Sequence, residues 1–182
     1  MSTPSADDVY FADLDKSFWG YDNIMNLYAK GIVQGSNGLI NPNGLITREE
    51  ICALITRSCN LNPNATNTEK LLKDISVSPW ALEYVSAAMS AGVLTGDDAG
   101  IAHGTSNATR EEAFSILARA FNIAQSDTNA EFLDIANVSD WAKGYINSMS
   151  AKDIIKGTEG YIHPGDSITR AEFFAVLDRI LR

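Results

Sequence analysis

The sequence repeats one short stretch three times, as Thr47-Arg-Glu-Glu50, Thr109-Arg-Glu-Glu112 and Thr169-Arg-Ala-Glu172. Each stretch begins with a threonine and carries a glutamate three residues later, which is the pattern of a helix capping box. In such a box the threonine side chain binds the backbone N–H of the glutamate, and the glutamate side chain binds the backbone N–H of the threonine. An apolar run at helical spacing follows each stretch, so the pattern predicts three equivalent helices that begin here.

Other residues recur with nearly the same period, which indicates an internal repeat. A tryptophan and a glycine each return every 61 residues, the arginine of the motif returns after 62 and 60 residues, and an aspartate opens each unit. The recurring residues are Trp19, Trp80 and Trp141, Gly35, Gly96 and Gly157, Arg48, Arg110 and Arg170, and Asp13, Asp74 and Asp134. We therefore divide the chain into a tail at 1–10, a first repeat at 11–60, a linker and second repeat at 61–121, and a linker and third repeat at 122–182.

Each repeat also predicts an earlier helix of about thirteen residues, estimated from its apolar spacing. A serine two residues before each tryptophan is the expected N-cap (Ser17, Ser78 and Ser139). Gly31 and Gly92 suit a left-handed stop, whereas Asp153 in the third repeat should end its helix less cleanly. One helix pair cannot bury its own apolar face, so we expect three helix-loop-helix repeats packed into one all-α body.

Composition and charge exclude several classes of protein. The 182 residues are 45% apolar, which is enough to build a core, and they carry a formal net charge of −9. This acidic balance argues against a nucleic-acid partner, because the phosphates would be repelled. No apolar run approaches the roughly 18 residues of a membrane span. The polar residues 1–8 predict no signal peptide within this chain.

Patterns for catalysis and metal binding are missing from the sequence. It contains no nucleophile elbow, phosphate-binding loop or dinucleotide fingerprint. Cys52 and Cys59 are seven residues apart on one predicted helix, too far for a disulfide, and are interpreted as small core side chains. His103 and His163 fall at matched loop positions, with Asn41 at the third. We expect no enzyme activity, no cofactor and no metal site.

Helix capping does not explain the arginine of the motif. Arg48, Arg110 and Arg170 occupy the first helical position, where the helix dipole disfavours a cation. Two compatible explanations are open. The arginine can pair with the aspartate that opens its own or a neighbouring repeat, or it can join the unpaired N–H groups of the helix N-terminus in binding a carboxylate or phosphate.

The repeated tryptophans and glycines have two interpretations each. A tryptophan near the start of an amphipathic helix is typical of a core, but its edge can also line a groove and contact a sugar. The glycines can supply a positive φ for a turn or let the backbone approach a ligand. A further arginine near the end of each second helix is interpreted as a solvated or packing residue (Arg57, Arg119 and Arg179).

Taken together, these motifs resemble the S-layer homology (SLH) domain. The resemblance rests on Phe-x-Asp-Leu/Ile, a tryptophan, Gly-x-x-Gly with a following proline, and Ile-Thr-Arg-Ala/Glu-Glu, and it covers residues 11–182. It implies a pseudo-threefold spindle, which is a monomeric chain folded like a trimer. It further implies that grooves between repeats bind secondary cell wall polysaccharide, especially polymers bearing pyruvylated N-acetylmannosamine, and so anchor surface proteins at the cell wall of Gram-positive bacteria.

The resemblance also assigns roles to the recurring residues. The three motif arginines would meet the pyruvate carboxylate, the aspartates and tryptophans would line the sugar side, and the glycines would give backbone access. The second repeat departs from the pattern, with His103-Gly104 where the others have proline, so its groove is expected to be distorted or inactive. Two other classes stay open: a protein–protein docking module, and a fragment of a surface enzyme whose catalytic part lies outside these residues.

Overall fold

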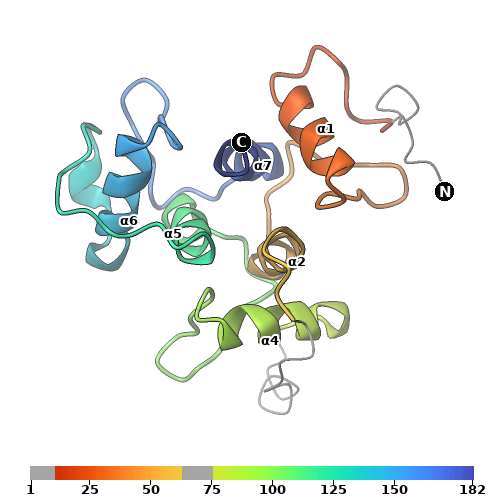
Figure 1. Ribbon diagram of the computed structural model, residues 1–182, viewed down its shortest axis with the longest axis horizontal. Coiled ribbons are helices and arrows are strands. Elements are labelled where there is room, and N and C mark those ends of the chain that lie inside the picture. Colours follow the sequence, from red (N-terminus) through yellow and green to blue (C-terminus); the bar gives the residue numbers. More distant parts are fainter. Residues whose placement is uncertain (1–10, 63–75) are drawn as a thin grey trace. The chain divides into compact units, whose positions relative to one another are not determined.

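The computed structural model describes residues 11–62 and 76–182, and within these ranges it is helical and contains no strand (Figure 1). The elements are α1 (Tyr21–Ala29), α2 (Arg48–Ser58), the 3-10 helix η2 (Pro79–Ala81), α4 (Leu82–Ser90), α5 (Arg110–Ala120), the 3-10 helix η3 (Ile135–Asn137), α6 (Asp140–Ala151) and α7 (Arg170–Ile180). The predicted all-α class is confirmed, and the pseudo-threefold packing stays a prediction. The predicted tail, most of the first linker and Asp74 lie outside the described residues.

The described residues divide into two compact units, one of 11–45 with 169–182 and one of 46–168. In the first unit α1 packs on α7, and in the second α4 packs on α2 and α6 on α5 (Figure 1). Each pair therefore joins the first helix of one repeat to the second helix of another. The apolar faces are completed between repeats, as expected for units too small to bury a core alone.

All three predicted capping boxes are present. Thr47, Thr109 and Thr169 are the N-caps of α2, α5 and α7, and in each box both reciprocal bonds form with the glutamate at the third helical position. We call these three the signature helices. Their inward faces are fully buried, with Ile51, Phe114 and Phe173 among the least exposed side chains.

The starts of the earlier helices differ from the prediction in two ways. Helix α6 begins directly after Ser139 and the 3-10 helix η2 directly after Ser78, with Pro79 at its first position as expected. Helix α1 instead begins at Tyr21 after Gly20, so Ser17 is not its N-cap. None of these helices has a side-chain cap bond at its N-terminus. The first two are also shorter than thirteen residues, since α1 and α4 have nine each.

The ends of these helices are alike in all three repeats. Gly31, Gly92 and Asp153 adopt left-handed φ angles of 71°, 70° and 56°. The backbone N–H of Asp153 donates to the Ser150 carbonyl just as that of Gly31 donates to Tyr28. The expectation that the third repeat would end less cleanly was wrong, because aspartate tolerates this conformation.

Within the unit of 46–168, the residues just before the three threonines form a closed ring of backbone hydrogen bonds. Ile46 N–H donates to Ile168, Ile168 N–H to Ala108, and Ala108 N–H to Ile46, at 3.2, 3.1 and 3.0 Å. All three side chains are fully buried. A residue from every repeat thus meets at one point, which sets the register of the repeats because buried N–H and C=O groups must be paired.

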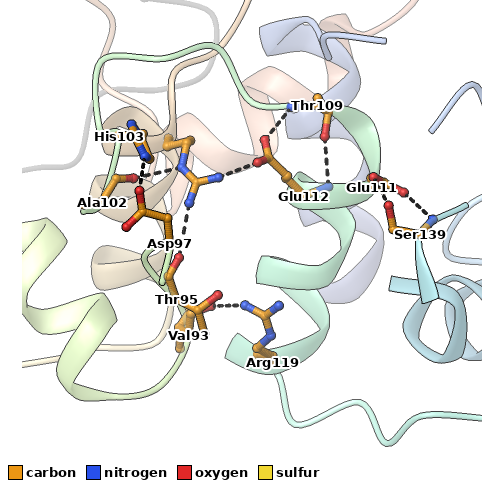
Figure 2. Close-up of polar contacts among 11 residues, drawn as sticks. Val93, Thr95, Asp97, Ala102, His103, Thr109, Glu111, Glu112, Arg119 and Ser139 are labelled. Atoms are coloured by element: carbon orange, nitrogen blue, oxygen red, sulfur yellow. Dashed lines mark hydrogen bonds and ion pairs between the residues drawn. The ribbon is translucent and has the colours of Figure 1, made fainter. Parts of the chain in front are cut away.

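A carboxylate from one repeat also holds the start of the next. The Glu111 carboxylate in α5 accepts from the backbone N–H and the hydroxyl of Ser139, at 2.9 and 2.8 Å (Figure 2). Glu49 in α2 holds Ser78 in the same way. The third motif has Ala171 at this position, and Ser17 instead bonds to Asp15 two residues away. The serines predicted as N-caps therefore act between repeats in two cases of three.

We expect Ser139→Ala to lower the free energy of unfolding by about 1–2 kcal/mol, because it removes a hydrogen bond to a part-buried carboxylate. Urea denaturation measures the loss. Ser17→Ala is the matched control, since Ser17 is exposed and its hydrogen bonds within the described residues go to Asp15, two positions away in the same repeat. It should change stability by no more than about 0.5 kcal/mol. Equal losses in the two variants would contradict a clamp between repeats.

Candidate functional site

A pocket of about 410 Å³ lies in the unit of 46–168 and draws on all three repeats. Arg48 comes from the first repeat, the 94–103 loop and one face of α5 from the second, and Trp141 from the third. The lining residues are Arg48, Leu94, Thr95, Gly96, Asp97, Asp98, His103, Glu112, Ile116, Arg119 and Trp141. Its volume lies in the range of about 300–1,000 Å³ usual for small-ligand sites.

Arg48 is held firmly at one wall of this pocket. Its Nε donates to the Ala102 carbonyl at 3.0 Å and its Nη2 to the Thr95 carbonyl at 3.2 Å. Its Nη1 forms an ion pair with Glu112, the capping glutamate of α5, and the arginine side chain is only 12% exposed. Its carboxylate partner among the described residues is therefore the capping glutamate of the next repeat, and not an aspartate that opens a repeat. This pairing offsets the cost of a cation at a helix N-terminus.

The N–H groups of the signature helices are not available to a ligand. In α2 the first two amides donate to the carbonyls of Ser106 and Gly104, at 3.0 and 2.9 Å. Helices α5 and α7 repeat this arrangement, with acceptors at Asp166 and Pro164 and at Gly44 and Pro42. The third amide of each helix bonds to the threonine of its capping box. The predicted anion site made of helix amides is therefore closed, because a loop from another repeat occupies it.

The other two motif arginines share part of this geometry. The Nε of Arg110 donates to the Ile162 carbonyl at 2.7 Å, and the Nε of Arg170 to the Ile40 carbonyl at 2.9 Å. Each guanidinium also lies 5.4 Å from the centre of a phenylalanine ring four residues later in its own helix. In all three repeats, the motif arginine therefore binds the backbone of a loop.

Two of the aspartates that open the repeats, Asp13 and Asp134, lie within the described residues, and both bind these loops from the other side. Asp134 is buried and accepts from the backbone N–H groups of Ile162 and His163, at 2.9 and 2.8 Å. Asp13 does the same with Ile40 and the residue after it, at 2.9 and 2.6 Å. One loop residue is therefore held at both of its backbone groups. Its N–H donates to the aspartate, and its carbonyl accepts from the motif arginine. The described contacts of the aspartate shape the loop.

The repeated glycines are required by the path of the loop. Gly35 and Gly157 have φ angles of 70° and 67°. A side chain at either would also meet the loop's own carbonyl oxygen, 2.9 Å away at Leu39 and 2.5 Å away at Tyr161. Gly96 has no positive φ, but a Cβ there would lie 2.8 Å from the backbone of Gly100. The turn interpretation holds for the first two, and close backbone packing explains the third.

The loop of the second repeat keeps the backbone path where distortion was predicted. Asn41, His103 and His163 all have left-handed φ angles, of 53°, 51° and 52°. The three residues are therefore structurally equivalent positions of the three loops. Gly104 accepts from the helix amide of Glu49 just as the prolines do in the other repeats. The loop differs earlier, where it is one residue longer between Gly96 and His103.

That longer loop brings charged groups into the pocket. Backbone N–H groups of Ile101 and Ala99 and the His103 ring bond to Asp97, the ring at 2.9 Å (Figure 2). The hydrogen bonds from Ile101 and His103 lower the pKa of the Asp97 carboxyl. Asp97 is therefore ionised at neutral pH, and the pocket offers carboxylate acceptors as well as guanidinium donors.

The repeated tryptophans are exposed, and not part of the core. Trp19, Trp80 and Trp141 are 60%, 53% and 49% exposed. The interpretation as core side chains was wrong, because each indole precedes or starts its helix and points away from the buried face. Trp141 contributes to the wall of the pocket.

Arg119 is a pocket residue that the sequence interpretation missed. Its Nη1 donates to the Val93 carbonyl at 2.9 Å (Figure 2), and its guanidinium lies 5.6 Å from the centre of the Tyr145 ring. Glu112, Ile116 and Arg119 follow one another by four and three residues, so they share one face of α5. This helical spacing is the sequence signal that could have placed Arg119 on the same face as Glu112. The arginine packs as predicted, and it also lines the pocket.

Residues 11–62 and 76–182 contain neither a cluster of metal-binding side chains nor a helix suited to a membrane. No group of three His, Cys, Asp or Glu side chains is placed to hold a metal ion. No helix has both the length and the hydropathy needed to span a membrane. Within the same ranges both cysteines are free, and burial raises the pKa of the Cys52 thiol to about 12.

Comparisons with known proteins agree on one family. The family model described as the S-layer homology domain matches residues 10–52, 72–114 and 131–174. The chain is 29% identical, over 98% of its length, to a surface-layer 125 kDa protein of Lysinibacillus sphaericus, of which it covers 15%. It is 32% identical, over 95% of its length, to the exoglucanase XynX of Acetivibrio thermocellus, of which it covers 16%.

A third relative is a cellulosome-anchoring protein of Acetivibrio thermocellus. The chain is 30% identical to it over 79% of its own length and covers 34% of that protein. The chain thus spans only a minor part of each of these relatives.

Asp134 gives a prediction about acid stability. Burial alone would raise the pKa of its carboxyl, but the two backbone N–H donors outweigh burial, and the pKa lies below the ordinary value of 3.8. A carboxyl whose pKa is lower in the folded state than in the unfolded state stabilises the folded state. This stabilisation is complete at pH values above the unfolded-state pKa of about 3.9, and it is lost as the pH falls through the folded-state pKa.

We expect Asp134→Asn to lower the free energy of unfolding by about 1–3 kcal/mol at pH 7, because both loop amides lose their charged acceptor and one of them faces the asparagine NH2 group, which cannot accept a hydrogen bond. The difference from the parent chain should shrink as pH falls below about 4. Urea denaturation of both proteins at pH 7 and at a pH below about 4 measures this difference in stability. Asp140→Asn is the control, because Asp140 is exposed. A difference that stays constant with pH would contradict the role of the carboxylate.

Proposed function

The chain belongs to the S-layer homology domain family, and we propose that it is a non-catalytic module that binds secondary cell wall polysaccharide and anchors a protein to the cell envelope. The observation that carries the proposal is the pocket. Arg48, Gly96 and Trp141, each from a different repeat, line one cavity, and they are the residue types assigned to carbohydrate by the family resemblance.

The chemistry of the pocket suits an acidic sugar. The exposed indole of Trp141 offers a flat apolar face for the C–H groups of a sugar ring. Asp97 and Asp98 offer acceptors for sugar hydroxyls, and Arg48 and Arg119 offer donors for a carboxylate such as that of a pyruvate ketal. This combination suits an acidic sugar, and the family resemblance supplies pyruvylated N-acetylmannosamine as the bound unit that we propose.

Charge limits how the polymer is captured. The chain carries a net charge of −9, and a polymer bearing pyruvate is also anionic. The repulsion is screened beyond about 8 Å at physiological salt. Affinity must then come from short-range hydrogen bonds and stacking in the pocket, and it gains from several sites on one polymer through effective concentration.

The remaining motif residues enter the proposal with two kinds of role. Arg110 and Arg170 are proposed as ligand-site residues because they occupy the same motif position as Arg48, which lines the pocket. Trp19 and Trp80 are proposed as further sugar platforms because they are as exposed as Trp141. The aspartates and glycines are proposed to support the site by shaping its loops; these residues are Asp13, Asp74 and Asp134 with Gly35, Gly96 and Gly157.

The names of the relatives support anchoring at the cell surface. One is a surface-layer protein and another a cellulosome-anchoring protein, while a third is an exoglucanase. An anchoring module is compatible with all three, because the rest of each protein can carry a different activity. We propose that the chain acts at the cell wall, as a monomer and without a catalytic role of its own.

The test uses Trp141→Ala and isolated cell walls. We expect the variant to bind walls about tenfold or more weakly, as expected when one aromatic contact of about 1.5 kcal/mol is lost. Leu133→Ala is the control, because Leu133 is 70% exposed and lies outside the pocket. Sedimentation with walls measures binding, and circular dichroism checks that both variants are folded.

The same walls stripped of polysaccharide separate the two non-catalytic functions. Binding that disappears with the polysaccharide supports the proposal. Binding that survives stripping, or that Trp141→Ala and Leu133→Ala weaken equally, would instead favour a protein–protein docking module.

A further inference from the structure

The pocket contains two arginines whose charges are balanced differently. Arg48 makes an ion pair with Glu112 and donates to two loop carbonyls, and its side chain is 12% exposed. Three of its five N–H groups therefore serve the protein itself. A side chain held in this way positions the loop, and its charge is already compensated.

Arg119 makes fewer polar contacts than Arg48. It donates one hydrogen bond, from Nη1 to the Val93 carbonyl, and its guanidinium lies over the Tyr145 ring. Among residues 11–62 and 76–182 it has no carboxylate partner. Within the described part of the chain no ion pair neutralises its charge, and most of its N–H groups remain for another acceptor.

We propose that Arg119 is the residue that binds the anionic group of the ligand, and that Arg48 is a positioning residue. This inference rests on the proposed function of the pocket. The Tyr145 ring and the Val93 carbonyl fix the plane of the Arg119 guanidinium, which leaves its planar fork ready for a bidentate carboxylate.

The arrangement of charge also orients the ligand. Asp97 and Asp98 lie on the loop side of the pocket and repel a carboxylate, whereas they accept hydrogen bonds from sugar hydroxyls. Arg119 lies in the last turn of α5, where the helix dipole favours a cation. The acidic substituent is therefore directed toward Arg119 at the C-terminal end of α5, and the neutral sugar hydroxyls toward the 94–103 loop.

The experiment reads binding at this pocket through the indole N–H signal of Trp141, assigned by its loss in Trp141→Phe. Two probes are titrated by NMR: the methyl glycoside of 4,6-O-pyruvylated N-acetylmannosamine, and the same glycoside without pyruvate. We expect Arg119→Gln to weaken the pyruvylated probe by about tenfold or more, the effect of losing a charge-assisted hydrogen bond. The unpyruvylated probe should change by less than about twofold, and Arg119→Lys should restore part of the loss.

Two further variants serve as controls. Arg57→Gln removes the arginine at the same repeat position, which lies 5.7 Å from the Tyr84 ring and does not line this pocket, so the Trp141 titrations should not change. Arg48→Gln should weaken both probes to a similar extent, because it disturbs the loop and not the charge recognition alone.

The outcomes separate this inference from the proposed function. Suppose first that the parent chain binds the pyruvylated probe. If Arg119→Gln then leaves the affinity for both probes unchanged, or lowers both affinities equally, the role of Arg119 is overturned and the proposed function stands. If the Trp141 signal of the parent chain does not respond to the pyruvylated probe, both are overturned. Selective loss of the pyruvylated probe supports the inference.

Discussion

The first turn of each signature helix depends on carbonyl groups that another repeat supplies. A helix N-terminus leaves amides without partners, and burying them unpaired is costly. Here two amides of α2 are paired by Ser106 and Gly104, and the same exchange serves α5 and α7. The loops must therefore be built accurately. The aspartates Asp13 and Asp134, the motif arginines and the left-handed residue within each loop all serve that requirement.

This constraint explains how one pocket is assembled from three repeats. The loop that caps α2 must reach it from the second repeat, which carries Gly96 and Asp97 to the side of Arg48. Packing α6 on α5 then brings Trp141 to the other wall. The contacts that complete the fold thus also build the site. Arg48, for example, forms an ion pair with Glu112 between two repeats and still lines the pocket.

Much of the fold could be predicted from the sequence, because its signals are local. The capping boxes need only a threonine and a glutamate three residues apart, and the left-handed stop needs only Gly31 or a residue that tolerates the same φ. The site was harder to predict. Trp141 has the spacing of a core residue but is exposed, and Arg119 looked like a packing residue although it also lines the pocket.

The sequence by itself determined the helical class and the start of each signature helix, since these follow from residues within one turn of each other. It also determined the three repeats, since the same residues return about every 61 positions. Only the tertiary structure decided which groups meet across repeats: that Glu112 neutralises Arg48, that loop carbonyls fill the helix N-termini, and that Arg119 has no carboxylate partner among the described residues. Such pairings join residues tens of positions apart, and they are selected by the requirement that every buried charge and amide find a partner.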